Sequence, residues 1–153
     1  MKKLFCLLLL LLCQAALADQ ITVRVVMPET MCDGVTPLTG IGRVKLYVSA
    51  DPIPYDDTYD CVTDGSANRP EPPSGFAPVT AAYQSGDYAE VIIDLTPGVK
   101  YYFRASIETA EGVEGALGLQ EEKVIPISLP GSPTIIILGD SGVFYPERGD
   151  FNG

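Results

Sequence analysis

Histidine and tryptophan are absent from this chain of 153 residues, and amphipathic helical periodicity is nearly absent as well. Without histidine the chain lacks the commonest general base and the commonest metal-binding side chain. Lys45, Lys100 and Lys123 stand singly on expected solvent faces and do not form an evident substitute. We therefore expect a chain that is not an enzyme and that needs no cofactor for catalysis.

Basic residues are also few, since 10 Lys and Arg stand against 20 Asp and Glu, for a formal net charge of −10. Residues 1–18 have the pattern of a secretory signal, with two lysines, an apolar run over 4–12 and small residues before a cleavage site. The apolar run is too short to span a bilayer comfortably. Because this segment holds two lysines and no acid, its removal changes the charge from −10 to −12. Such a surface repels nucleic acid and anionic lipid.

Export follows from this pattern. We expect a secreted or periplasmic protein, acting outside the cell or at its surface, with no membrane contact after signal cleavage. Two alternatives stay open. The segment could be retained as a membrane anchor, or Cys13 could be lipidated, because "LLLC" is similar to a bacterial lipobox in which Leu12 stands where a small residue is expected.

Only two cysteines, Cys32 and Cys61, remain once residues 1–18 are removed. An oxidising compartment favours a disulfide between them. Closing a loop of about 30 residues would stabilise the fold by roughly 3.5 kcal/mol on the chain-entropy model. The alternative is two free thiols.

Short alternating segments, separated by 13 prolines and 15 glycines, fill most of the remaining chain. A period of two is typical of strands with one buried face. Weaker strands are expected over 76–83 and 119–128, and 134–138 is a short apolar run. Inward positions are Ile21, Val23, Val25, Val44, Leu46, Val48, Val91, Ile93, Leu95, Val99, Tyr101, Phe103, Ala105 and Ile107. Outward positions are Arg43, Lys45, Tyr47, Lys100, Tyr102, Arg104 and Ser106. The series predicts an all-β, antiparallel two-sheet sandwich.

Residues 51–75 interrupt this rhythm with a polar loop rich in proline, glycine and aspartate, and a loop of that length needs tethering. A Cys32–Cys61 bridge would supply a tether. The loop also offers hard oxygen ligands, so calcium is possible, although the spacing does not match an EF-hand and a solvated loop is the alternative. The candidate calcium ligands are Asp56, Asp57, Asp60 and Asp64, with Asp51 nearby.

The segment Leu95-x-Pro97-Gly98-x-x-Tyr101 resembles the turn between the fifth and sixth strands of a fibronectin type III domain. The resemblance implies that Leu95 closes the core, that Pro97 and Gly98 make the turn, and that the Tyr101 hydroxyl binds back to the turn backbone. It extends over residues 21–128 and implies an adhesion, spacer or recognition module.

Two departures from that family concern its first strands. Val25 stands where the family has a core tryptophan, and cleavage after residue 18 leaves no room for a strand ahead of 21–25. The apolar run Thr134–Leu138 could fill this place, in its own domain or in a neighbouring copy, by strand addition. The alternative is that it extends the sheet after 119–128.

The expected function is therefore an exported, non-enzymatic binding module for a protein or glycan partner. Loops on a rigid sandwich carry function, so we expect contacts through 51–75 and 109–118, with Tyr55, Tyr59, Glu111 and Glu114 as candidate binding residues. The tyrosines could equally pack their loop onto the sheet. Two alternative functions are a filament or appendage subunit that assembles through 134–138 and an accessory domain of carbohydrate recognition.

Overall fold

Alternating apolar side chains form the first strand, β1 (Asp19–Val26), whose Ile21, Val23 and Val25 are fully buried. The computed structural model describes residues 18–30, 35, 37–64, 68–127, 134–139 and 143–144. In it β1 pairs antiparallel with β4 (Tyr88–Leu95) and parallel with β7 (Thr134–Leu138). These three strands make one sheet, in the order β4-β1-β7.

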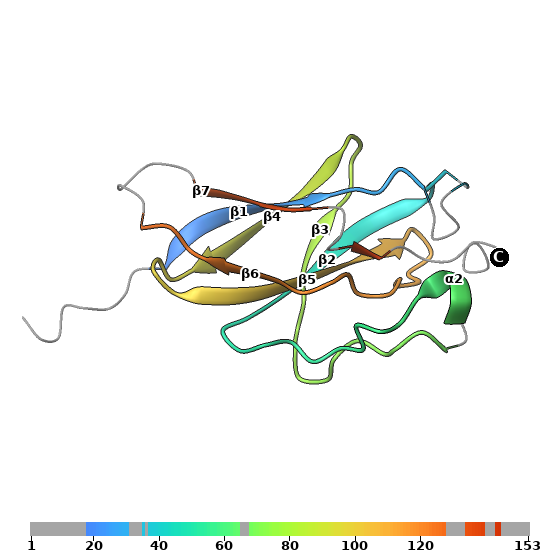
Figure 1. Cartoon of the computed structure of the whole chain (residues 1–153). Helices are drawn as coiled ribbons and strands as arrows, with labels where there is room; N and C mark the ends of the chain where they lie inside the picture. The colour runs from blue at the N-terminus through green and yellow to red at the C-terminus, as the bar shows by residue number, and fades with distance from the viewer. Residues whose placement is uncertain are drawn as a thin grey trace, which may run out of the picture.

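The second sheet has the order β3-β2-β5-β6, built from β2 (Ile41–Ser49), β3 (Val79–Ala82), β5 (Lys100–Thr109) and β6 (Glu121–Val124). The two-residue strand β8 (Val143–Phe144) adds to β5 in parallel. One helical turn, α2 (Cys61–Asp64), lies in the long connection between β2 and β3. Figure 1 shows the three-stranded sheet above, the four strands β3-β2-β5-β6 below it, and the long connection beneath both.

The hydrophobic core lies between the two sheets. Its largest members are Phe103 and Leu46 from one sheet and Ile21 from the other, together with Leu138 of β7. The predicted all-β sandwich of two sheets is thus confirmed. Its pairing is not purely antiparallel, because β7 runs parallel to β1 and β8 runs parallel to β5. In the part of the chain that is described, no helix is long and apolar enough to cross a membrane.

The place of residues 134–138 corrects one expectation. This run does not extend the sheet after β6, which was the alternative given above. It crosses to the other sheet and pairs with β1 of its own chain, from Ile21 beside Thr134 to Val25 beside Leu138. Ile136 and Leu138 point into the core and are 7% and 2% exposed. The physical reason is that β1 would otherwise leave a bare edge beside the core.

The expected outward face of β2 and β5 is also corrected. Tyr47, Arg104 and Ser106 are 2%, 2% and 0% exposed, although alternation placed them toward solvent. Alternation reports which side chains share a face, and it does not report what covers that face. Here the long connection covers it, so the middle of β5 is buried on both sides.

The corner between β4 and β5 contains the segment from Leu95 to Tyr101. Leu95 is buried at the end of β4, and Tyr101 is partly buried against the core. The backbone N–H of Thr96 donates a hydrogen bond to the Tyr101 hydroxyl over 3.3 Å. Gly98, which follows Pro97, has φ +77°, a conformation that favours glycine at this turn.

Candidate interaction surface

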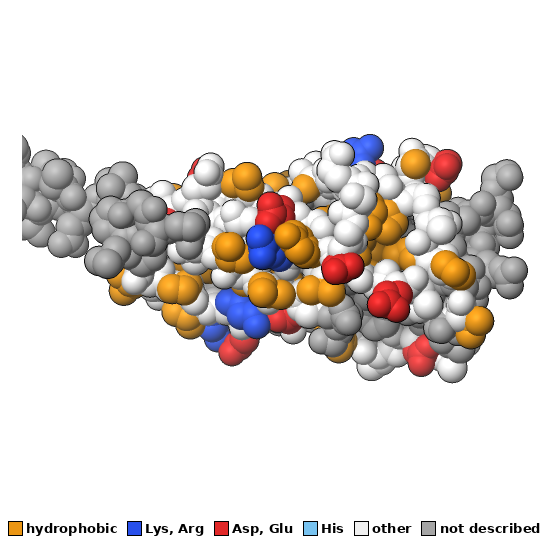
Figure 2. All heavy atoms as spheres, turned by 90° about the horizontal axis from the view of Figure 1, so that it is seen from above, with side chains coloured by type: hydrophobic (Ala, Val, Ile, Leu, Met, Phe, Trp, Pro, Cys, Tyr) orange, Lys and Arg blue, Asp and Glu red, His pale blue; other side chains and the backbone are white. Residues whose placement is uncertain are grey.

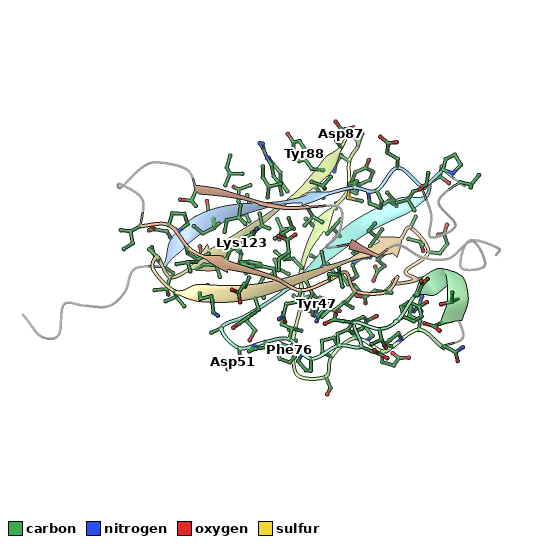
Figure 3. All side chains as sticks on the ribbon, viewed as in Figure 1. Tyr47, Asp51, Phe76, Asp87, Tyr88 and Lys123 are labelled. Atoms are coloured by element: carbon green, nitrogen blue, oxygen red, sulfur yellow. The ribbon has the colours of Figure 1, made fainter. Side chains whose placement is uncertain are left out.

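The long connection forms a small second core against the outer face of the four-stranded sheet. Tyr47, Ile53 and Leu117 are almost fully buried there, and Tyr55, Phe76 and Tyr102 pack around them. Figure 3 shows Tyr47 and Phe76 together on this lower side, far from Tyr88 on the upper side. The long connection therefore covers this face of the sheet with residues of the same chain.

Arg104 is the polar anchor of that layer. Its Nε donates to the Ile53 carbonyl over 3.1 Å and one terminal nitrogen donates to the Gly118 carbonyl over 2.9 Å. The same guanidinium holds the Asp57 carboxylate with two bonds of 2.6 and 3.0 Å. It also lies 5.5 Å from the centroid of the Tyr55 ring. The Arg104 guanidinium therefore joins β5, the long connection and the loop after β5 at one buried point.

The two loop tyrosines proposed as contact residues lie under the loop. Tyr59 is 7% exposed and Tyr55 is half-buried. The Tyr55 hydroxyl donates to the Pro70 carbonyl over 3.3 Å and accepts from the Leu117 N–H over 3.0 Å. Burial raises the pKa of Tyr55, and this outweighs the hydrogen bond from Leu117, which lowers it. Their geometry is that of residues that pack the loop onto the sheet.

Glu114, the third candidate, is the acceptor of a buried network at the start of the loop after β5. Tyr47 and Ser106 both donate to its Oε1, over 2.9 and 2.5 Å. Lys45 Nζ bridges Glu114 and Glu108 at 2.6 and 2.5 Å, and Arg43 adds a second ion pair to Glu108. The two carboxylates are thus matched by two cations.

The pKa values in this network follow from burial and charge. For Lys45, burial lowers the pKa, but the hydrogen bonds and charges of Glu108 and Glu114 outweigh it and the net pKa is raised. For Tyr47, burial is the first cause of a strongly raised pKa, and Glu114 adds to it. Glu111, the fourth candidate binding residue, lies apart from the network and is exposed.

The four candidate calcium ligands do not converge among the described residues, where no group of three or more acidic or thiol side chains is placed to hold a metal ion. Asp57 binds Arg104 instead. Asp56 accepts from the backbone and hydroxyl of Thr58, and the Thr58 hydroxyl is the main reason why the pKa of Asp56 is lowered. Asp64, in α2, accepts from the backbone N–H of Asp60, which precedes that helical turn. The predicted Cys32–Cys61 bridge falls outside the described residues, as does Cys13.

The outer face of the three-stranded sheet contrasts with the covered one. Its outward positions include four large hydrophobic side chains that are 43 to 58% exposed: Tyr88, Ile92, Ile135 and Ile137. Register brings them together, since Thr22 of β1 lies between Ile92 and Ile135 in neighbouring strands. We call these four residues the apolar face. Figure 2 looks down on it and shows hydrophobic side chains around a few charged ones.

Charge on this side is low and mostly paired. Arg24 donates to Glu90 over 2.9 Å in the register-matched position of β4, and its guanidinium lies 4.5 Å from the centroid of the Tyr88 ring. Asp94 is the other charged residue that points outward from these strands. A nearly neutral surface on a chain of net charge −10 is unusual and favours contact with a partner.

A pocket lies beside this face, at the connection between β3 and β4. Its volume is about 270 Å³, and it is lined by Ala82, Gln84, Ser85, Tyr88, Ala89 and Glu90. That volume is slightly below the range typical of small-molecule sites, roughly 300–1,000 Å³. The Tyr88 ring at its border is already in contact with Arg24. The pocket gives little support for a dedicated small-ligand site.

The apolar face was missed by the reasoning from sequence, although a signal was present. The run at 134–138 is apolar at both odd and even positions, which one buried face does not require. Comparisons with models of protein families, with curated proteins and with solved structures find no match for this chain.

Proposed function

We propose that this chain is an exported, non-enzymatic interaction module of fibronectin type III type, and that it binds a protein partner through the apolar face. The observation that carries this is the contrast between the two outer faces. One is closed by Arg104 and the long connection, while the other leaves Ile92, Ile135 and Ile137 about half exposed. Exposed apolar side chains that share a face mark protein contacts more often than they serve the fold.

The family assignment within this proposal has two supports. They are the all-β architecture of two packed sheets and the contact of the Tyr101 hydroxyl with the Thr96 backbone at the corner between β4 and β5. Export is supported by residues 1–18, and the non-enzymatic role by the absence of histidine. The partner surface proposed here replaces the loop tyrosines, since Tyr55 and Tyr59 are engaged in packing.

The experiment is site-specific photocrosslinking in cells that naturally export the protein. A benzophenone side chain replaces Ile92 or Ile137 on the apolar face, and Glu71, which is exposed in the long connection, serves as the control position. We expect discrete adducts of higher mass from 92 and 137 and none from 71. Adducts from position 71 alone would refute the proposed surface, and mass spectrometry identifies the partner.

A second candidate function is an assembly subunit that donates residues 134–138 to a neighbouring copy. The observation in its favour is that β7 occupies the place beside β1 from the far end of the chain, in parallel orientation. The same segment could complete the sheet of another subunit, because strand addition uses the same backbone hydrogen bonds. Strand donation is head-to-tail and gives a ladder of oligomers on a non-denaturing gel, whereas a twofold contact stops at a dimer.

A further inference from the structure

The outer edge of β7 differs from two of the other sheet edges, β4 and β6, and it is longer and more apolar than the third, the four-residue strand β3 (Val79–Ala82). β7 is the last strand in the order β4-β1-β7, and its residues Ile135–Leu138 contain no charge and no proline. At the far end of the same sheet β4 carries Glu90 and Asp94, and in the other sheet β6 carries Glu121, Glu122 and Lys123. Charged side chains and proline are the usual means of keeping an edge strand from pairing with another chain.

We propose that β7 pairs with β7 of a second copy of this chain, antiparallel and about a twofold axis, to give a continuous six-stranded sheet. The inference rests on the proposed function and names the partner of the apolar face. Opposite residues in an antiparallel pair point to the same side. In a register centred on Ile136, Ile136 therefore lies beside Ile136 of the second copy on the core side. On the outer side, Ile135 of each copy lies beside Ile137 of the other.

Self-complementarity favours a second copy over an unrelated protein. The half-exposed Ile135 and Ile137 match each other across the axis, and apolar cross-strand pairs of this kind stabilise a sheet. Two strongly acidic molecules repel one another over most of their surfaces, but this face adds little to that repulsion. Among the outward positions of β4, β1 and β7, Arg24, Glu90 and Asp94 are charged, and the first two already form an ion pair.

The test is sedimentation equilibrium of the exported protein over a wide concentration range, with two matched variants. Ile137→Lys charges the edge strand and Ile92→Lys charges the far strand of the same face, at residues that are 58% and 57% exposed. We expect a dimer for the unaltered protein. We expect Ile137→Lys to weaken dimerisation by at least about tenfold, since each lysine would replace the apolar partner of Ile135 in the other copy and the two lysines would lie diagonally across the strand pair. Ile92→Lys should leave the dimer intact.

A second readout is amide hydrogen exchange, which should slow at Ile135–Leu138 as protein concentration rises and should not change with concentration in Ile137→Lys. Circular dichroism and thermal melting check that both variants fold.

Each other outcome overturns the inference. Loss of the dimer in both variants indicates sheets packed face to face, and loss in neither places the contact elsewhere. A ladder beyond the dimer indicates strand donation. A monomer at every concentration removes self-association, and adducts of positions 92 or 137 with a different protein would still support the proposed function.

Discussion

Arg104 holds the long connection over one outer face of the molecule, and the other outer face, the apolar face, is left exposed. Arg104 is 2% exposed, and its guanidinium binds two carbonyls and one carboxylate from two segments, the long connection and the loop after β5. A buried cation of this kind is tolerated only because each of its partners is present. Removing it leaves the Ile53 and Gly118 carbonyls without their hydrogen-bond donor.

We expect Arg104→Met to lower the free energy of unfolding by about 3 kcal/mol, because the side chain fills similar space and leaves buried acceptors unsatisfied. Asp57→Asn is the matched comparison. The Asp57 side chain is 51% exposed, and its loss of charge should cost about 1 kcal/mol or less. Urea denaturation measures both, and equal effects would contradict the anchoring role of the carbonyl contacts.

Tyr101 acts through its hydroxyl at the corner between β4 and β5. Tyr101→Phe keeps the ring against the core and removes the acceptor of the Thr96 N–H. We expect a loss of about 1 kcal/mol in unfolding free energy. Chemical denaturation of the variant gives the value, and a stability equal to that of the unaltered protein would show that the hydroxyl contributes nothing.

Lys45 and Tyr47 predict a loss of stability at alkaline pH. Both have pKa values raised in the folded protein above ordinary values of 10.5 and 10.0. Folding therefore favours their protonated forms, and their contribution is complete below the ordinary values and lost as pH rises through the folded ones. Unfolding free energy should fall above about pH 10. Tyr47→Phe should reduce the slope, and an unchanged slope would exclude a contribution from this phenol.

At the scale of elements, β7 combines a structural face with an exposed one. Ile136 is 7% exposed in the core and Ile137 is 58% exposed beside it. Ile136→Ala should cost about 2–4 kcal/mol through lost burial and the cavity that remains. Ile137→Ala should change the stability of the monomer by less than about 0.5 kcal/mol. Thermal or urea denaturation below the dimerisation range separates them, and similar losses would show that β7 is placed differently.

Sequence periodicity predicted the strands well and their surroundings poorly. Ile21, Val44, Val91 and Phe103 were assigned to the interior correctly, because one buried face requires alternation. Arg104 was misassigned, because a long loop can cover an outer face without changing the strand's own pattern.

Residues of the candidate site were harder still to predict from sequence. Glu114 and Tyr47 meet only through the pairing of β2 with β5 and the fold of the following loop. The apolar face joins Ile92 to Ile135 through β1 across a separation of more than forty residues, and nothing local in the sequence reports that pairing. The apolar run of β7 is the one local signal, because a run without alternation indicates contacts on both sides of the strand.

At the scale of the whole molecule, charge sets how association responds to salt. The formal net charge of −10 opposes the approach of two copies, while the contact proposed between them is apolar. Salt screens that repulsion. Dimerisation should therefore tighten as sodium chloride rises from low to physiological concentration, in sedimentation experiments. Weakening with salt would indicate an interface held by ion pairs and would argue against the β7 contact.

The pairing of β1 with β7 also fixes the order in which the chain can fold. Ile21 can pair with Thr134 only after the more than one hundred residues between them have been synthesised, so shorter nascent chains cannot complete this sheet. Contacts so distant along the backbone close slowly. The export that we propose would gain from such a delay, because β1 stays unpaired with β7 until β7 has been synthesised.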